Sequence, residues 1–424
     1  MERIRIEARR GRQRPQAATS GARIRALCFD RGALDRSVYL RRRLAAVAVA
    51  VVATVLLWLL LFGGDDGAEP ASGPPEVTIA QLQPETQALL AGLDDEGKVD
   101  QLILAADPPA DGGAVGGALV STDLWQSSGG SEDLIKGFHD AGASEPPAIS
   151  GADDSAPATG IPAMVGTTQE GGTYRELPDL PPEQRAIEIG DAGDPKAAER
   201  WGAEMAQALR KAGFDFNIGP LADIATLDSA IADRAFSDDP ATVDAMVGAA
   251  FSGCADEDFA CIPAHFPGQG ATAEDTAAGP ASVSIDAGTL ASRDLLPFES
   301  AFAAGAPAVV VSNAFFAAYD PVTPASLSPE VLDGLLRTQL GFTGVAITGD
   351  LLEGAIRAGY KVDEAAVEAV VAGADMVQLS DRESIEPVRS ALLAAVESGE
   401  ISADRLTSAA GRVIEMKQEL GLLD

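Results

Sequence analysis

Residues 264–277 read A-H-F-P-G-Q-G-A-T-A-E-D-T-A. This stretch begins at the end of one of the short apolar runs that decide the fold of the chain. Several of these runs are followed by Gly or Pro and then by a helix-length amphipathic stretch, such as residues 197–212. Alternation of strands and helices predicts a parallel sheet covered by helices. The runs cover residues 117–121, 161–166, 214–219, 259–266, 281–285, 306–313, 342–349 and 374–380.

Eight such runs predict an α/β fold, a closed (β/α)8 TIM barrel with its site at the carboxyl ends of the strands. A doubly wound open sheet is the alternative, and it would normally show a Gly-rich phosphate turn after its first strand. Residues 112–117 (G-G-A-V-G-G) precede a strand instead. Residues 143–160 predict a loop between the first two barrel strands, and residues 402–423 predict an amphipathic helix that packs on the barrel.

A single transmembrane helix is predicted before the barrel. Residues 44–62 form an uncharged apolar run, long enough for roughly 28 Å of helix, which is close to the hydrocarbon thickness of a bilayer. An Arg-rich tail precedes it at 1–43, an acidic Pro/Gly linker follows at 63–78, and the barrel domain is expected at 79–424. The tail is interpreted as solvated, with binding of a cytoplasmic partner or of anionic lipid as the alternative.

The Arg bias predicts a cytoplasmic N-terminus and an extracytoplasmic barrel, so the expected location is the cell membrane. A cleaved signal peptide is the alternative, but the leader before the apolar run exceeds 40 residues and no A-x-A site directly follows the run.

Net charge and cysteine content exclude some classes of function. The chain has a formal net charge of −33, and because residues 1–43 are basic, everything after them is more acidic still. Such a surface repels phosphate backbones, so nucleic-acid binding is not expected.

Cys254 and Cys261 fall outside the membrane in this topology, where a disulfide could form, although the sequence leaves free thiols open. Only two histidines are present, and we expect neither a metal site nor a cofactor.

Seven further motifs accompany the 264–277 stretch in a fixed order. Together they resemble glycoside hydrolase family 3, in its branch of bacterial β-N-acetylhexosaminidases, over about 340 residues. That branch usually reads K-H-F-P-G-H-G-D-T-x-x-D-S-H where this chain has 264–277. The other motifs are K-V-D-Q-L (98–102), Q-E-G-G (169–172), F-N-I-G-P-L-A-D (216–223), R-A-F-S-D-D-P (234–240), S-R-D-L-L-P-F (292–298), L-S-P (327–329) and L-G-F-T-G-V (340–345).

The resemblance implies a retaining glycosidase, but the catalytic positions differ. Such enzymes use a carboxylate nucleophile and a second group as acid/base. The family's nucleophilic Asp, in S-D-D-L, corresponds to Gly349, and the acid/base His corresponds to Ala277. Asp350 and Asp275 are the remaining candidates. The alternative roles are an N-cap of the following helix for Asp350 and a loop hydrogen-bond acceptor for Asp275.

Several of the family's sugar-binding residues are also replaced in this chain. The family's Lys, its middle His, and the Asp and Arg that flank Q-E-G-G correspond to Ala264, Gln269, Thr168 and Thr173. Five polar residues remain as candidate ligand contacts, although retention as scaffold is the alternative for them. They are Arg234, His265, Glu170, Asp223 and, as partial compensation, Arg175.

The expected protein is therefore a membrane-anchored barrel that binds a glycan, such as a peptidoglycan fragment, or a protein partner, without family 3 catalysis. An active β-N-acetylhexosaminidase with relocated carboxylates is the alternative. A purely structural barrel is the third hypothesis.

Overall fold

The computed structural model describes residues 82–109, 115–141 and 160–423. The predicted tail, transmembrane segment and linker, and nearly all of the predicted 143–160 loop, lie outside these residues. Among the helices of the described ranges, none combines the length and apolarity needed to cross a membrane.

Eight parallel strands form the central sheet, in the order β5-β4-β3-β2-β1-β11-β10-β7. Beyond β5, Phe266 donates its amide to the Val310 carbonyl and accepts from the Ser312 amide, both at 2.8 Å, which brings the two sheet edges together. The result is a nearly closed, TIM-like barrel, and the expected α/β fold is confirmed. The strands are β1 Ile103–Ala106, β2 Gly117–Leu119, β3 Met164–Thr167, β4 Phe216–Leu221, β5 Ala260–Ala264, β7 Ala308–Val311, β10 Val345–Asp350 and β11 Met376–Leu379.

One of the eight predicted strands belongs to a different sheet, so its assignment to the barrel was wrong. Residues 281–285 supply β6 (Ser282–Val283), which pairs with β8 (Phe315–Phe316) and β9 (Asp320–Pro324) in a separate three-stranded sheet. The missing barrel strand is β1, whose apolar residues directly follow a helix in the chain. An apolar run that continues a helical pattern cannot be separated from the helix by periodicity alone.

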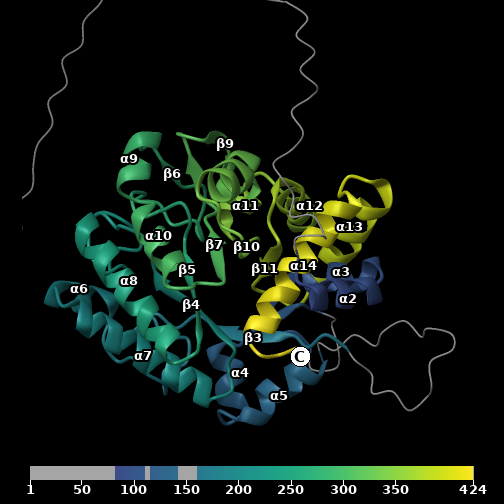
Figure 1. Cartoon of the computed structure of the whole chain (residues 1–424). Coiled ribbons are helices and arrows are strands. Elements are labelled where there is room, and N and C mark those ends of the chain that lie inside the picture. The colour runs from purple at the N-terminus through teal and green to yellow at the C-terminus, as the bar shows by residue number, and fades with distance from the viewer. Residues whose placement is uncertain (1–81, 110–114, 142–159, 424) are drawn as a thin grey trace, which may run out of the picture. The chain divides into compact units, whose positions relative to one another are not determined.

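Helices surround the strands (Figure 1). They are α2 Pro84–Gly92, α3 Asp95–Gln101, α4 Thr122–Ser127, α5 Glu132–Ala141, α6 Ala186–Ala192, α7 Pro195–Lys211, α8 Pro240–Asp256, α9 Ala287–Ser292, α10 Leu296–Ala303, the π-helical segment Glu330–Gln339, α11 Gly354–Arg357, α12 Val362–Ala372, α13 Ile385–Ser398 and α14 Ala403–Glu419. The predicted closing helix is thus confirmed as α14.

The two longest outer helices of the first half, α7 and α8, begin at matching signals. Asp194 and Asp239 cap them by accepting backbone amides, and a proline follows each cap. Glycine then lets the helices approach closely, because a Cβ on Gly202 would lie 2.1 Å from the Ala250 carbonyl oxygen. A disulfide joins Cys254 near the end of α8 to Cys261 in β5, which settles the alternative that the sequence left open.

Period-two alternation divides the core into two clusters. In β1, Leu104 belongs to the cluster inside the barrel, while Ile103 and Ala105 belong to the cluster beneath the helices. Val413 and Met416 of α14 join the inner cluster, so this helix covers part of the barrel interior.

Candidate functional site

The predicted polar residues stand on segments that follow the carboxyl ends of neighbouring strands. Glu170 follows β3, Asp223 follows β4, His265 follows β5, and Asp350 ends β10. Parallel strands bring these ends to one edge of a barrel, which is where TIM barrels carry their sites. The structure thereby groups four residues that lie up to 180 positions apart in the chain.

Glu170 and Arg234 form a two-pronged ion pair. Arg234 Nε donates to Glu170 Oε2 at 2.8 Å, and its terminal nitrogen donates to Oε1 at 2.6 Å. Burial alone would lower the pKa of Arg234, but its bonded carboxylate raises it above the ordinary value, with Asp223 and Asp275 adding to the effect. A permanent, oriented cation therefore stands at the site.

Asp223 is fully buried and organises the 264–277 loop. Its Oδ2 accepts from the backbone amide and Nδ1 of His265 at 3.1 and 2.9 Å, and its Oδ1 accepts from the Gln269 amide at 2.7 Å. Asp223 is thus committed to the loop. The bond from Nδ1 to Asp223 fixes the orientation of the His265 ring. Within the described ranges, the other ring nitrogen, Nε2, has no hydrogen-bond partner.

Asp350 is held by the backbone. Its Oδ1 accepts from the amides of Leu352 and Ser380, both at 3.0 Å, so it braces the turn after β10. The N-cap alternative is wrong, since the residue that caps α11 is Glu353.

Asp275 has the simpler of its two expected roles. It is exposed, and its Oδ1 accepts from the Ala277 amide at 2.9 Å within the same loop. This is the predicted loop acceptor, in a position from which it acts electrostatically on Arg234.

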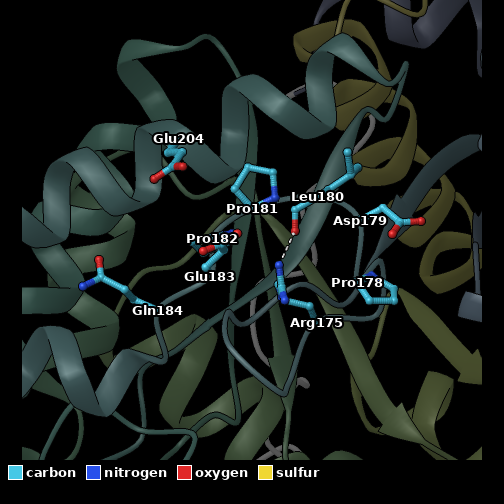
Figure 2. A pocket seen from close by; sticks show the side chains of 9 residues that line it. All are labelled: Arg175, Pro178, Asp179, Leu180, Pro181, Pro182, Glu183, Gln184 and Glu204. Carbon is cyan, nitrogen blue, oxygen red and sulfur yellow. Dashed lines mark hydrogen bonds between the residues drawn. The ribbon is translucent and has the colours of Figure 1, made fainter.

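Arg175 hydrogen-bonds to the backbone of the loop, residues 172–180, in which it lies. Its Nε donates to the Gly172 carbonyl at 2.7 Å and NH1 donates to the Leu180 carbonyl at 3.2 Å. Figure 2 shows this guanidinium at a surface pocket of about 500 Å³ that the loop forms with α7. Its role as a ligand contact stays a prediction. The other lining residues are Pro178, Asp179, Leu180, Pro181, Pro182, Glu183, Gln184 and Glu204.

Asn313 is a site residue that the sequence did not identify. It is buried just beyond β7, and a Cβ on Gly349 would lie 2.8 Å from its Nδ2. That Nδ2 donates to the Asp350 carbonyl at 2.8 Å and to Glu353 Oε2 at 3.0 Å, while Oδ1 accepts from the Ser326 hydroxyl at 2.6 Å. An amide with all its bonds made therefore covers the position where the family has its nucleophile.

Gln269 and Ser312 are two more buried polar residues close to these strand ends. Gln269 Oε1 accepts from the Ser312 hydroxyl at 2.7 Å, and both side chains are buried. Ser312 and Asn313 both end the apolar run 306–313, which is the one signal that could have marked them beforehand. Polar residues at the end of a buried strand have to find partners; here Ser312 bonds Gln269, and Asn313 bonds Ser326.

Glu353 is a further group that sequence reasoning missed. It is half-buried, and burial raises the pKa of its carboxyl, against the opposing effects of Asn313, Thr276 and His265. Asp350 raises this pKa further. A carboxyl that keeps its proton more readily than usual therefore lies beside Asn313.

Known proteins share both the sequence and the fold. The glycosyl hydrolase family 3 N-terminal domain matches residues 144–416. A β-hexosaminidase of Stenotrophomonas maltophilia is 34% identical over 235 residues, which are 53% of this chain and 69% of that protein. A family 3 β-N-acetylglucosaminidase structure from Paenibacillus sp. superposes with a TM-score of 0.70 at 30% identity, over 78% of this chain and 63% of that one. A β-N-acetylhexosaminidase structure from Beutenbergia cavernae gives 0.65 at 25% identity, over 77% and 99%.

Proposed function

Because the chain belongs to glycoside hydrolase family 3, we propose that its barrel binds a terminal N-acetylhexosamine unit of a glycan, such as a peptidoglycan fragment, without the family's covalent intermediate. The observation that carries this proposal is Asn313 packed over Gly349 in a site that keeps its other polar pairs. Glycine cannot form a bond to a sugar, and a buried amide fills the adjoining space.

Ligand binding is supported by two preformed pairs, Glu170–Arg234 and Asp223–His265. Each pair orients a side chain at the strand ends before a ligand arrives, which lowers the entropic cost of binding: Arg234 presents N–H donors, and neutral His265, whose Nδ1–H donates to Asp223, presents Nε2 as an acceptor. Sugar hydroxyl and acetamido oxygens can accept from the Arg234 guanidinium, and a sugar hydroxyl can donate to His265 Nε2. The amino-sugar class follows from the relatives, which are β-hexosaminidases.

Loss of turnover by the family's route is supported by the carboxylates that remain. Asp350 and Asp275 both accept backbone amides through Oδ1, and neither is the residue at the nucleophile position. Ala277 carries no group that could shuttle a proton.

The test is titration calorimetry of the full chain with N-acetylglucosamine and with a muropeptide, together with an assay on a nitrophenyl N-acetylglucosaminide. We expect saturable binding and no turnover. Arg234→Lys should weaken binding because Lys cannot keep the two-pronged bond to Glu170, whereas exposed Arg200→Lys is the matched control. Absence of binding to both ligands would refute the proposal and favour a structural barrel or a protein partner.

A second candidate function is hydrolysis of β-linked N-acetylhexosaminides through relocated carboxylates. The hexosaminidase relatives favour it, and so does the Glu353 carboxyl close to the nucleophile position. Turnover that disappears in Asp350→Ala or in Glu353→Ala would establish this candidate over binding alone.

We also propose that residues 44–62 anchor the protein in the cell membrane, with the barrel outside the cytoplasm. The apolar run, the basic tail before it and the disulfide support this topology, since disulfides persist in oxidising compartments. Protease added to intact cells should digest the barrel. A barrel that stays protected until the cells are lysed would argue for the opposite orientation.

A further inference from the structure

Glu353 occupies a defined place between the end of β10 and the start of α11. Two backbone bonds fix this junction against the 264–277 loop and its continuation: Gly354 N donates to the Ala277 carbonyl at 3.0 Å, and Ala355 N donates to the Thr276 carbonyl at 2.9 Å. A Cβ on Gly354 would lie 2.6 Å from the Ala278 carbonyl, so the two segments touch through their backbones. The backbone that directly follows Glu353 is therefore held against this loop by main-chain contacts.

The carboxyl group of Glu353 reaches the neighbourhood of the missing nucleophile. Asn313 Nδ2 lies 3.0 Å from Glu353 Oε2, and the same nitrogen would lie 2.8 Å from a Cβ on Gly349. The side-chain amide of Asn313 thus contacts both the Glu353 carboxyl and the backbone of Gly349. A strand-end carboxylate faces the anomeric carbon in a retaining glycosidase, so a group this close stands near the glycosidic bond of a bound sugar.

The side chain is also accessible. Glu353 is half-buried, in contrast to the fully buried Asp223, whose two oxygens are both bound by the 264–277 loop. The hydrogen bond to Asn313 involves Oε2, and Thr276 also hydrogen-bonds this carboxyl, so a ligand shares the group with these two partners.

We propose that Glu353 is a ligand-contacting residue of this site, and that its protonated carboxyl donates a hydrogen bond to the glycosidic oxygen of the bound amino sugar. This inference rests on the proposed function, namely that the site binds an amino sugar. It adds the residue that recognises the glycosidic end of the ligand.

The surroundings of Glu353 favour the protonated form. Burial and the nearby Asp350 carboxylate raise the pKa of Glu353, while Asn313, Thr276 and His265 act in the opposite direction. Among the described residues, His265 and Asp350 are the titratable groups whose charges act on it most strongly. Ligand affinity that depends on the Glu353 proton must fall as pH rises through this raised pKa.

The experiment is calorimetric titration of the full chain with methyl β-N-acetylglucosaminide between pH 4.5 and pH 8, on the order of one titration per half unit around the ordinary Glu pKa. Wild type should bind about tenfold more weakly at the upper end, which corresponds to the loss of one hydrogen bond. Glu353→Gln keeps a donor and should bind equally across the range. Glu353→Ala should bind weakly at every pH.

Glu368→Gln is the matched control, because Glu368 is exposed on α12 and should leave the wild-type pH profile unchanged. Melting temperatures of all variants separate lost binding from lost fold. A Glu353→Gln profile identical to wild type, or affinity that rises with pH, would overturn the role of Glu353 while leaving the proposed function intact. Failure of wild type to bind at any pH would instead refute the proposed function.

Discussion

The side-chain amide of Asn313 lies against the backbone of Gly349, so that a Cβ on residue 349 would stand 2.8 Å from Asn313 Nδ2 and 2.9 Å from its Cγ. Asn313 cannot easily move, because Ser326, Glu353 and the Asp350 carbonyl hold its amide. Gly349 and Asn313 are therefore matched to each other, and replacing either one alone disturbs the pair.

We accordingly expect Gly349→Asp to produce no gain of glycosidase activity over wild type and to lower the free energy of unfolding by about 1–3 kcal/mol through overpacking. Urea denaturation and the nitrophenyl assay measure the two effects. Gly359 has open space beside it, so Gly349→Ala should cost more than Gly359→Ala.

The same relationship predicts a coupling in a double-mutant cycle. Asn313→Ala removes the obstructing amide, so Gly349→Asp should cost less in that background than in wild type. Equal costs in the two backgrounds would show that Asn313 does not limit residue 349.

Asp375 is a second buried group on which stability depends. It is fully buried and bonded to three guanidiniums, those of Arg337, Arg405 and Arg412. Asp375→Asn leaves three buried cations without their counter-ion, so we expect a loss of about 3–5 kcal/mol in the free energy of unfolding. Asp228→Asn, at an exposed position, should have almost no effect in the same urea titration.

Asp375 should also affect acid stability. Burial alone would raise its pKa, but Arg412, Arg337 and Arg405 together hold it below the ordinary value. A depressed carboxyl pKa contributes stability at pH values above the unfolded pKa and loses it as pH falls through the folded one. Wild type should therefore lose stability below about pH 4, and Asp375→Asn should lack this component.

The Cys254–Cys261 disulfide should stabilise the junction of α8 and β5. Closing so short a loop restricts the unfolded chain, and we expect reduction to cost roughly 2–3 kcal/mol. Urea denaturation with and without a reducing agent measures this cost. The double variant Cys254→Ala/Cys261→Ala should have the same free energy of unfolding as the reduced wild type, and the reducing agent should not change it. If the reducing agent does not change the free energy of unfolding of wild type either, the disulfide does not contribute to stability.

Lys417 gives a pH dependence of the same sign at higher pH. It is fully buried on α14, where it donates to Gln101, and burial lowers its pKa to about 7 despite the opposing effect of Asp215. Because the unfolded chain then binds a proton that the folded protein does not, the free energy of unfolding should rise between pH 7 and the ordinary pKa of 10.5.

Lys417→Met should abolish that rise. It should also stabilise the protein at pH 6 by about 2 kcal/mol after the loss of the Gln101 bond is deducted. Exposed Lys196→Met is the control. A Lys417→Met variant that is less stable than wild type at pH 6 would show that the Gln101 bond outweighs the cost of burial.

Apolar runs that alternate with helical stretches predicted most of the barrel, and the errors have physical causes. Within the 281–285 run, Ser282–Val283 do form a strand, but it pairs with β8 in a separate sheet with β9. Periodicity reports that a segment is half-buried and does not report which sheet it joins. Pairing is decided by contacts between distant segments, as in the bridge from Phe266 to Val311.

The sequence by itself determined which chemical groups are present. Gly349 and Ala277 carry no carboxylate or imidazole in any conformation, and Glu170, Arg234, Asp223 and His265 were identified from motif order alone. Only the tertiary structure decided what surrounds them. Asn313 and Glu353 meet over Gly349 because β7 and β10 are neighbours in the barrel, although 40 residues separate the two side chains in the chain. A hydrogen bond at that separation depends on strand order and register, which motif spacing does not contain.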